Sequence, residues 1–260
     1  MTGVKTEAEL IAAANQSYVG SYRKLAQHSA GGEIREVGGV FAFVTGLPVA
    51  LFNGCVVVER TGEVELGAAL DWIARRDVPH RVWIDEAVLT TDLADVAITR
   101  GYRQDDEPYP GMILHPVSEP PPPSDGVSVV AVTERDLDRH IALRIEGGIP
   151  PALARSLYSS SFAADPDVQI FTAVLDGRPV GNAMAIRTGE VSGVYDVGTL
   201  PEARRRGVGT AASWAAAAAG RRWGCDPIVL QASEMGAPVY ASMGFRTVVR
   251  YAVFRRPPKN

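Results

Sequence analysis

The carboxy-terminal half of the chain alternates short, β-branched apolar runs with longer amphipathic stretches. Runs in which apolar and polar positions alternate predict strands, whereas apolar residues at every third or fourth position predict helices. An Asp-Gly dipeptide at Asp176 between two of the runs predicts a tight hairpin. An alanine-rich stretch farther along predicts a long helix. The predicted strands span residues 127–132, 168–175, 179–187 and 191–200; one helix begins near Thr133, and the long helix spans Val208–Arg222.

A weak internal repeat relates the two halves of the chain. Arg75–Ile84 aligns without a gap with Arg221–Leu230, and each segment reads as a helix end, a turn and a short strand. Farther on, Arg100–Arg103 and Met243–Arg246 each end a helix at a glycine and open a strand with an aromatic residue. The repeat predicts two similar α/β modules in tandem.

A proline-rich segment separates the two halves. Glu119–Asp125 reads EPPPPSD, and consecutive prolines favour an extended connector because they fit neither a helix nor a central strand. The net charge changes at the same place, from −7 over residues 1–120 to +3 over residues 121–260. We therefore expect one domain at 1–118, a linker at 119–125 and a second domain at 126–260. A surface loop within a single domain is the alternative.

The composition is that of an ordinary globular protein. Apolar residues make up 46% of the 260 residues, charged residues 22%, and the mean hydropathy is +0.02, which argues against a disordered chain or a fibre. No apolar run approaches the ~20 residues that span a bilayer, and the start of the chain does not resemble a secretory signal. We expect a cytoplasmic protein that binds no membrane, with Cys55 and Cys225 as reduced thiols.

Charge and residue spacing argue against three further classes of function. The net charge of −4 does not suit a general nucleic-acid binder, which usually has one broad basic face. No His, Cys and carboxylate residues stand together at ligand spacing, so we expect no metal site. No Gly-x-Ser-x-Gly elbow occurs, which disfavours a serine nucleophile.

The residues that carry chemistry lie between the last of these strands and the alanine-rich helix. Pro201–Thr210 reads PEARRRGVGT, with three consecutive arginines ahead of Gly207 and Gly209. Glycines let backbone N–H groups approach a phosphate closely, and the start of the following helix adds unpaired N–H groups and a positive dipole. The pattern predicts an anion-binding turn for a diphosphate or a nucleotide phosphate, although neither a GxxxxGK[ST] loop nor a GxGxxG motif is present there.

This turn resembles the acyl-CoA-binding motif of the GNAT superfamily of N-acyltransferases. The family pattern is Arg/Gln-x-x-Gly-x-Gly/Ala, and Arg204, Gly207 and Gly209 match its fixed positions. The second family signature, Asn/Ser-x-x-Ala-x-x-Leu-Tyr-x-x-x-Gly-Phe, resembles Ser233–Phe245, in which Gly236 stands where the family has alanine. The resemblance covers about residues 127–256. It implies a tandem α/β (α+β) protein in which each module has a mixed, mostly antiparallel sheet flanked by helices.

The resemblance implies that acetyl-CoA, or another acyl-CoA, is the co-substrate and that a primary amine of a small molecule or peptide is the acceptor. It also implies that Tyr240 protonates the leaving thiolate, since a phenol with a pKa of about 10 holds its proton at neutral pH. Backbone groups of the strand predicted at 191–200 would pair with the pantetheine arm, and N–H groups of the turn would hold the pyrophosphate. The implied acyl-CoA-binding residues are Val197, Gly198, Thr199, Arg204, Arg205, Arg206, Gly207, Val208, Gly209 and Thr210.

Two carboxylates are candidates for the base that takes the proton of the attacking amine. Asp196 lies on the predicted strand that leads to the turn, and Glu234 stands at the start of the second signature. In a regular strand Asp196 shares a face with Val194 and Gly198, and the sequence does not say whether this face meets the substrate. We predict Asp196 as the base; a structural or solvated carboxylate is the alternative for both residues.

The amino-terminal module lacks counterparts of the chemistry-bearing residues. Glu63, which aligns with Gly209 of the turn, would repel a pyrophosphate. We expect a degenerate GNAT-like module that covers the active one, and its charge of −7 would suit a cationic amine. The positions that align with Arg204, Gly207, Gly209 and Tyr240 are Val58, Thr61, Glu63 and Ala97.

The sequence thus predicts an acyl-CoA-dependent N-acetyltransferase in which the amine attacks the thioester directly within a ternary complex, with a monomer and a homodimer both open. A non-catalytic acyl-CoA-binding sensor is one alternative. A nucleotide-phosphate-binding module of another fold is the other.

Overall fold

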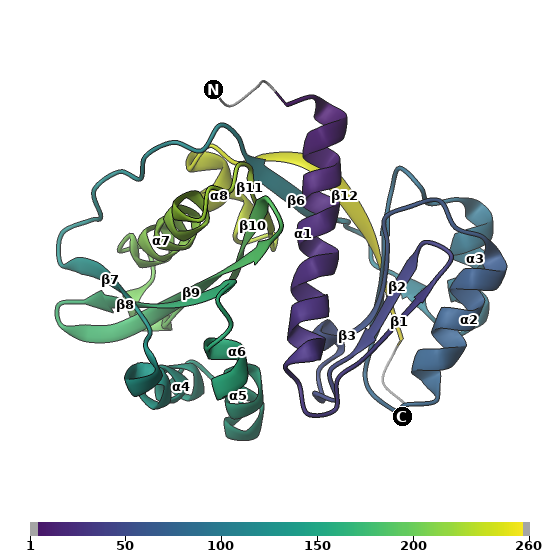
Figure 1. Ribbon diagram of the computed structural model, residues 1–260, viewed down its shortest axis with the longest axis horizontal. Helices are drawn as coiled ribbons and strands as arrows, with labels where there is room; N and C mark the ends of the chain where they lie inside the picture. Colours follow the sequence, from purple (N-terminus) through teal and green to yellow (C-terminus); the bar gives the residue numbers. More distant parts are fainter. Residues whose placement is uncertain (1–4, 257–260) are drawn as a thin grey trace. The chain divides into compact units, whose positions relative to one another are not determined.

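The computed structural model describes residues 5–256, and contacts divide the chain into two compact units (Figure 1). The amino-terminal unit comprises Tyr22–Gly111 and the described residues from Val249 to Arg256. The carboxy-terminal unit comprises Met112–Val248 and the described residues from Lys5 to Ser21. Helix α1 (Glu7–Gln27) therefore contributes its first part to one unit and its last part to the other.

The amino-terminal unit is built on a mixed sheet with strand order β1-β2-β3-β4-β12. Strands β3 and β4 run parallel, because helix α2 crosses between them, and the other pairs along this order are antiparallel. Tyr22 of α1 stacks on Phe43 of β2, with ring centroids 4.3 Å apart. The elements are β1 (Glu33–Val37), β2 (Val40–Val44), η1 (Ala50–Phe52), β3 (Asn53–Val57), α2 (Glu63–Ala74), β4 (Arg81–Asp85), α3 (Thr91–Thr99), β5 (Arg103–Gln104) and β12 (Arg246–Arg255).

The carboxy-terminal unit has the strand order β6-β11-β10-β9-β8-β7. Helix α7 covers one face of this sheet and helices α4, α5 and α6 lie on the other (Figure 1). Small side chains on α7, such as Ala212 and Ala216, are fully buried against the sheet. The elements are β6 (Tyr109–Leu114), β7 (Val127–Ala131), η2 (Glu134–Asp136), α4 (Leu137–Glu146), α5 (Pro151–Leu157), α6 (Ser160–Ala163), β8 (Val168–Leu175), β9 (Arg178–Thr188), β10 (Val191–Thr199), η3 (Pro201–Ala203), α7 (Val208–Arg222), β11 (Ile228–Gln231) and α8 (Ala237–Ser242).

The predicted fold class is confirmed, and the two units share details of backbone structure. In each, a helix connects two parallel strands: α2 joins β3 to β4, and α7 joins β10 to β11. The next helix ends on a left-handed glycine, Gly101 in one unit and Gly244 in the other. The following aromatic N–H then bonds back to a carbonyl five residues earlier. The hairpin predicted at Asp176 is also present, with positive φ at Asp176 and at the glycine after it.

The compact units group the chain differently from the predicted division at 1–118, 119–125 and 126–260. The carboxy-terminal unit also includes the start of α1, where the Tyr195 hydroxyl of β10 donates to the Ser17 carbonyl at 3.0 Å and lies 2.9 Å from the Ser17 hydroxyl. Its core includes Met112 and Leu114 of β6. Conversely, most of β12 belongs to the amino-terminal unit, where Tyr251–Arg255 pair with β4. The predicted boundaries divide the chain into consecutive segments. The compact units instead exchange terminal elements, since the carboxy-terminal unit includes the start of α1 and the amino-terminal unit includes most of β12.

Candidate active site

A bulge in β10 sets the position of Asp196. The strand pairs regularly with β9 up to Tyr195 opposite Met184, and the register then shifts before Gly198 opposite Asn182. Asp196 has a φ of +47°, a left-handed conformation that few residues other than glycine, asparagine and aspartate adopt. The regular alternation expected for this strand therefore does not hold at Asp196, because the extra residue re-aims its side chain.

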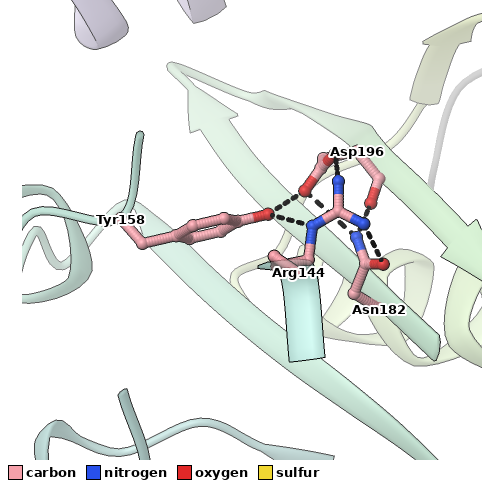
Figure 2. Close-up of polar contacts among 4 residues, drawn as sticks. All are labelled: Arg144, Tyr158, Asn182 and Asp196. Carbon is pink, nitrogen blue, oxygen red and sulfur yellow. Dashed lines mark hydrogen bonds and ion pairs between the residues drawn. The ribbon is translucent and has the colours of Figure 1, made fainter. Parts of the chain in front are cut away.

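Three side chains from three other parts of the unit surround the Asp196 carboxylate (Figure 2). Arg144 of α4 donates from Nη2 to Asp196 Oδ1 at 2.7 Å. The Tyr158 hydroxyl, at the end of α5, donates to Oδ2. Asn182 of β9 donates from Nδ2 to Oδ2 at 3.0 Å and also to the Asp196 carbonyl. Arg144 links the group further, since it donates to the Tyr158 hydroxyl at 3.1 Å and to Asn182 Oδ1 at 2.8 Å.

The electrostatics of this group suit a proton acceptor. The Asp196 side chain is 30% exposed to solvent. The groups packed around its carboxylate nevertheless exclude water, and this desolvation raises the pKa of Asp196 above its ordinary value. The Arg144 guanidinium and the hydrogen bonds from Tyr158 and Asn182 oppose that rise in pKa. Burial also raises the pKa of Tyr158 well above 10, so its hydroxyl stays protonated and acts as a donor. Asp196 is thus oriented by fixed donors while remaining reachable from solvent.

A turn with an exposed helix start follows β10. Arg205 and Gly207 both have positive φ, and Gly207 is the N-cap of α7. Gly207 has no side chain with which to cap the helix, so within residues 5–256 the first-turn N–H groups of α7 have no side-chain cap. The side chains of Arg204, Arg205 and Arg206 are exposed around this helix start, and Arg206 lies 3.5 Å from Asp176. These features suit an anion.

The two glycines of the turn differ in how closely their neighbours lie, since a Cβ at Gly209 would make an ordinary van der Waals contact and one at Gly207 would clash. A Cβ at Gly209 would lie 3.4 Å from Thr199 Oγ1, and one at Gly207 would lie 2.2 Å from Ser124 Oγ. The second contact shows that the proline-rich segment lies against the turn and belongs to the carboxy-terminal unit. Prolines 120–123 and the α7 residues Thr210 and Trp214 line a cavity of about 360 Å³ beside Gly207.

The edge of β10 toward β11 is open near the turn. Within the described chain only Ser192 and Gly193 of β10 pair with β11, so the two strands part before Val197. The backbone from Val197 to Thr199 pairs with β9 on its other side. An extended ligand could therefore add along this edge as a further strand.

The remaining predicted residues lie on or before α8. Tyr240 is half-buried on this helix, and its ring meets Phe245 at a centroid distance of 6.0 Å. Glu234 is exposed in the turn before α8. Asp196 and Tyr240 thus come from separate elements, β10 and α8. Within residues 5–256 there is no group of three or more His, Cys, Asp or Glu residues that could hold a metal ion, and no helix long and apolar enough to cross a membrane.

Sequence reasoning missed Arg144, Tyr158 and Asn182. Their separations from Asp196 in the chain, 52, 38 and 14 residues, give no local motif. One signal was available. Arg144 lies on the helix predicted to begin near Thr133, directly after the buried residues His140, Ile141 and Leu143. A charged side chain next to a buried helix face needs a partner of opposite charge or a hydrogen-bond acceptor.

The amino-terminal unit shows why its corresponding turn differs. Helix α2 has Gly62 as its N-cap, so by element Gly62 corresponds to Gly207, and the predicted alignment of Thr61 with Gly207 is wrong by one residue. The helices differ in length, so a register drawn from their ends does not hold at their starts. A Cβ on Gly62 would lie 2.4 Å from Glu65 Oε2. A carboxylate of the protein thus lies over the start of α2, where an anion would otherwise bind.

The other predicted counterpart holds in detail. The Tyr102 N–H bonds to the Ala97 carbonyl as the Phe245 N–H bonds to the Tyr240 carbonyl. Ala97 therefore occupies the place of Tyr240 in the amino-terminal unit, and it is fully buried.

Comparison with known proteins places these features in a family. Residues 140–245 match the model of the acetyltransferase (GNAT) family. The chain contains a GNAT acetyltransferase domain. This domain includes Arg144, Tyr158, Asn182, Asp196, the turn before α7 and Tyr240. No curated protein matches the sequence.

Solved structures extend the GNAT fold over nearly the whole chain. A GCN5-related N-acetyltransferase from Kribbella flavida has a TM-score of 0.70 and 21% identity, with 94% of this chain and 96% of that chain covered. One from Sphaerobacter thermophilus has a TM-score of 0.61 and 22% identity, with coverages of 85% and 78%. A tandem GNAT protein from the clavulanic acid biosynthesis pathway has a TM-score of 0.58 and 16% identity, with coverages of 89% and 82%. At these identities the likeness concerns the fold.

Proposed function

We propose that the protein transfers an acetyl group from acetyl-CoA to a primary amine by direct attack within a ternary complex. The observation that carries this proposal is the arrangement along β10. Asp196 lies at the bulge, the open edge at Val197–Thr199 follows it, and the uncapped start of α7 comes next. A base, a strand edge for an extended arm and an anion site thus follow one another along one continuous segment of backbone.

The turn before α7 supplies the binding of the phosphates. First-turn N–H groups and the dipole of α7 would hold the pyrophosphate, and Arg204–Arg206 would add charge. Gly207 fits this role, because a side chain there would collide with Ser124 at the start of α7, and Gly209 keeps the first turn of the helix free of a side chain. Backbone groups at Val197–Thr199 would hold the pantetheine arm as an added strand.

The chain's side chains would manage two protons. Asp196 would take a proton from the acceptor's ammonium group, which leaves a neutral amine able to attack the thioester carbonyl carbon. As the C–N bond forms and the C–S bond breaks, Tyr240 would give its proton to the sulfur of CoA, and the second proton that the nitrogen loses on becoming an amide would return to the Tyr240 oxygen. Arg144, Tyr158 and Asn182 would keep the Asp196 carboxylate in place throughout.

Two measurements separate this proposal from its alternatives. Acetyl-CoA should raise the melting temperature more than ATP does, because ATP lacks the pantetheine arm that the β10 edge would bind. With acetyl-CoA and a panel of amines present, free CoA thiol should be released steadily. Tight binding without thiol release would instead support an acyl-CoA sensor. Stabilisation by ATP and not by acetyl-CoA would support a nucleotide-binding module.

A further inference from the structure

An ion pair faces the surface at the centre of the proposed site. Arg144 Nη2 lies 2.7 Å from Asp196 Oδ1, and the side chains of Arg144 and Asp196 are 12% and 30% exposed to solvent. Each belongs to a different element, α4 or β10, and Asn182 of β9 bonds to both. The site therefore presents one positive and one negative group side by side.

Arg144 has hydrogen-bonding capacity to spare. A guanidinium carries five N–H donors, and three of them are used by Tyr158, Asn182 and Asp196. Among residues 5–256 Arg144 donates to no other acceptor, which leaves two N–H groups for a ligand. A fork of this kind matches a carboxylate.

The guanidinium also lies against the backbone of β10. A Cβ at Gly198 would stand 3.0 Å from Arg144 Nη1 and 2.5 Å from Asn182 Oδ1. Gly198 is part of the open edge where the pantetheine arm would bind, so Arg144 is close to the place proposed for the acyl-CoA. A group bound by Arg144 would lie near both Asp196 and the acyl-CoA.

We propose that the acceptor is a small zwitterionic amine, a free α-amino acid, whose ammonium group lies at Asp196 and whose carboxylate lies at Arg144. This inference rests on the proposed function and names its acceptor class. In an α-amino acid the two charged groups sit on one carbon, so they need a cation and an anion side by side, as Arg144 and Asp196 are. The carboxylate stays bound at Arg144 while the nitrogen loses one proton to Asp196 and attacks the thioester carbonyl carbon. The nitrogen then loses a second proton to the Tyr240 oxygen, which has given its own proton to the sulfur of CoA, and becomes an amide.

A polyamine or an aminoglycoside fits this arrangement less well. Such an acceptor carries several ammonium groups. Within the described chain, Asp196 is the one carboxylate that hydrogen-bonds to Arg144, Tyr158 and Asn182, so the site offers a single negative group. A second ammonium group beside the first would face the Arg144 guanidinium and be repelled.

The experiment compares matched acceptors on the full-length protein. Release of CoA thiol from acetyl-CoA is measured with each of the amino acids that occur in proteins, supplied as the free acceptor. The best of them is then compared with its own α-carboxamide and with a diamine of similar length. We expect kcat/KM for the acid to exceed that for the carboxamide about 10- to 100-fold, as for the loss of a hydrogen bond between charged groups. Amine reactivity cannot produce this preference, because the carboxamide has the lower amine pKa and offers more neutral amine.

Variants of two arginines on α4 assign the preference to one residue. In Arg144→Gln the ratio of acid to carboxamide should fall to about one, and Arg144→Lys should restore part of it. The ratio is informative even if the substitution also slows the reaction, since general damage affects both acceptors alike. Arg139→Gln is the control, because Arg139 lies exposed on the same helix, and it should keep the full ratio.

The possible failures are distinguishable. Equal turnover of acid and carboxamide, a preference for the diamine, or an unchanged ratio in Arg144→Gln would each overturn the amino-acid acceptor while leaving N-acetyl transfer intact. Preference for the diamine would match a cationic acceptor attracted by the acidic amino-terminal half. No thiol release with any amine would overturn the proposed function itself, and this inference with it.

Discussion

The Tyr158 hydroxyl donates a hydrogen bond to the Asp196 carboxylate, although the two residues lie 38 positions apart in the chain. The contact joins the end of α5 to the bulge of β10, and Arg144 bonds to both partners. A carboxylate with donors on both oxygens has one orientation, which a general base needs in order to meet its proton. The bulge and these donors together distinguish Asp196 from an ordinary surface carboxylate.

Replacement of Asp196 by asparagine should remove the proposed base and keep the backbone conformation. Asparagine tolerates a left-handed φ and has nearly the same shape, so the bulge should persist. We expect kcat/KM to fall about 10²- to 10⁴-fold, the usual contribution of a general base. Asp77→Asn is a matched control, since Asp77 also has a positive φ, of 48°, and lies in the other unit. Equal activity of the Asp196 variant and this control would exclude Asp196 as the base.

Replacement of Tyr158 by phenylalanine should change the pH dependence of catalysis. As the proposed base, Asp196 would have to be deprotonated, so kcat/KM should fall as the pH is lowered through the pKa of Asp196. Desolvation raises that pKa, and the Tyr158 hydrogen bond counteracts the rise. Loss of the hydroxyl should therefore move the acidic limb of the pH profile to higher pH, by about one unit for a hydrogen bond to a charged group. A limb that stays in place, or moves to lower pH, would contradict the assignment.

Replacement of Gly207 by alanine should abolish tight acetyl-CoA binding. The new Cβ would meet Ser124, and the positive φ adds about 1–2 kcal/mol of strain. Gly224 is the matched control, because it follows the other end of α7 with a similar φ of 81° and no neighbour within 4 Å of a new Cβ. Both alanine variants carry the strain of the positive φ, and Gly207→Ala adds the contact with Ser124. Calorimetry should show weaker acetyl-CoA binding in Gly207→Ala alone. Equal affinities in the two variants would place the phosphates elsewhere.

Replacement of Tyr240 by phenylalanine should spare binding and slow turnover. The ring contact with Phe245 can persist without the hydroxyl, so the fold of α8 should be retained. The proton for the sulfur of CoA would be missing, and kcat should fall while the dissociation constant for acetyl-CoA stays constant. An unchanged kcat would assign the proton to another donor.

The isolated segment 126–260 should fail to form a stable domain. It lacks the start of α1, where Ser17 bonds to Tyr195 next to the bulge, and it lacks Met112 and Leu114 of the core. Circular dichroism and thermal melting should show a loss of cooperative unfolding compared with the full chain. A cooperatively folded segment with a melting temperature near that of the full chain would show that these terminal elements are dispensable.

Local patterns predicted the elements and the turn because their causes are local. The span of α7 follows from its alanine content, and the hairpin at Asp176 follows from an Asp-Gly pair that accepts positive φ. The turn at Gly207 and the helix end at Gly244 were identified for the same reason. Each depends on neighbours within a few positions of the chain.

The group around Asp196 could not be predicted because its causes are distant. The bulge that aims Asp196 depends on its pairing with β9, and Arg144 and Tyr158 reach it from helices far away in the sequence. The composition of the units was hidden for a similar reason, since Ser17 and Tyr195 are 178 positions apart. A linear division of the chain cannot represent a helix that contributes to both units.

The most direct test of acetyl transfer is the product balance of one reaction. Full-length protein, acetyl-CoA and the preferred amine are incubated together, and both the N-acetylated amine and free CoA are quantified over time by mass spectrometry. We predict that the N-acetylated amine and free CoA appear in equal amounts over many turnovers, at a rate that Asp196→Asn lowers about 10²- to 10⁴-fold. Free CoA without an acetylated amine, or an equal rate in the Asp196→Asn variant, would contradict this prediction.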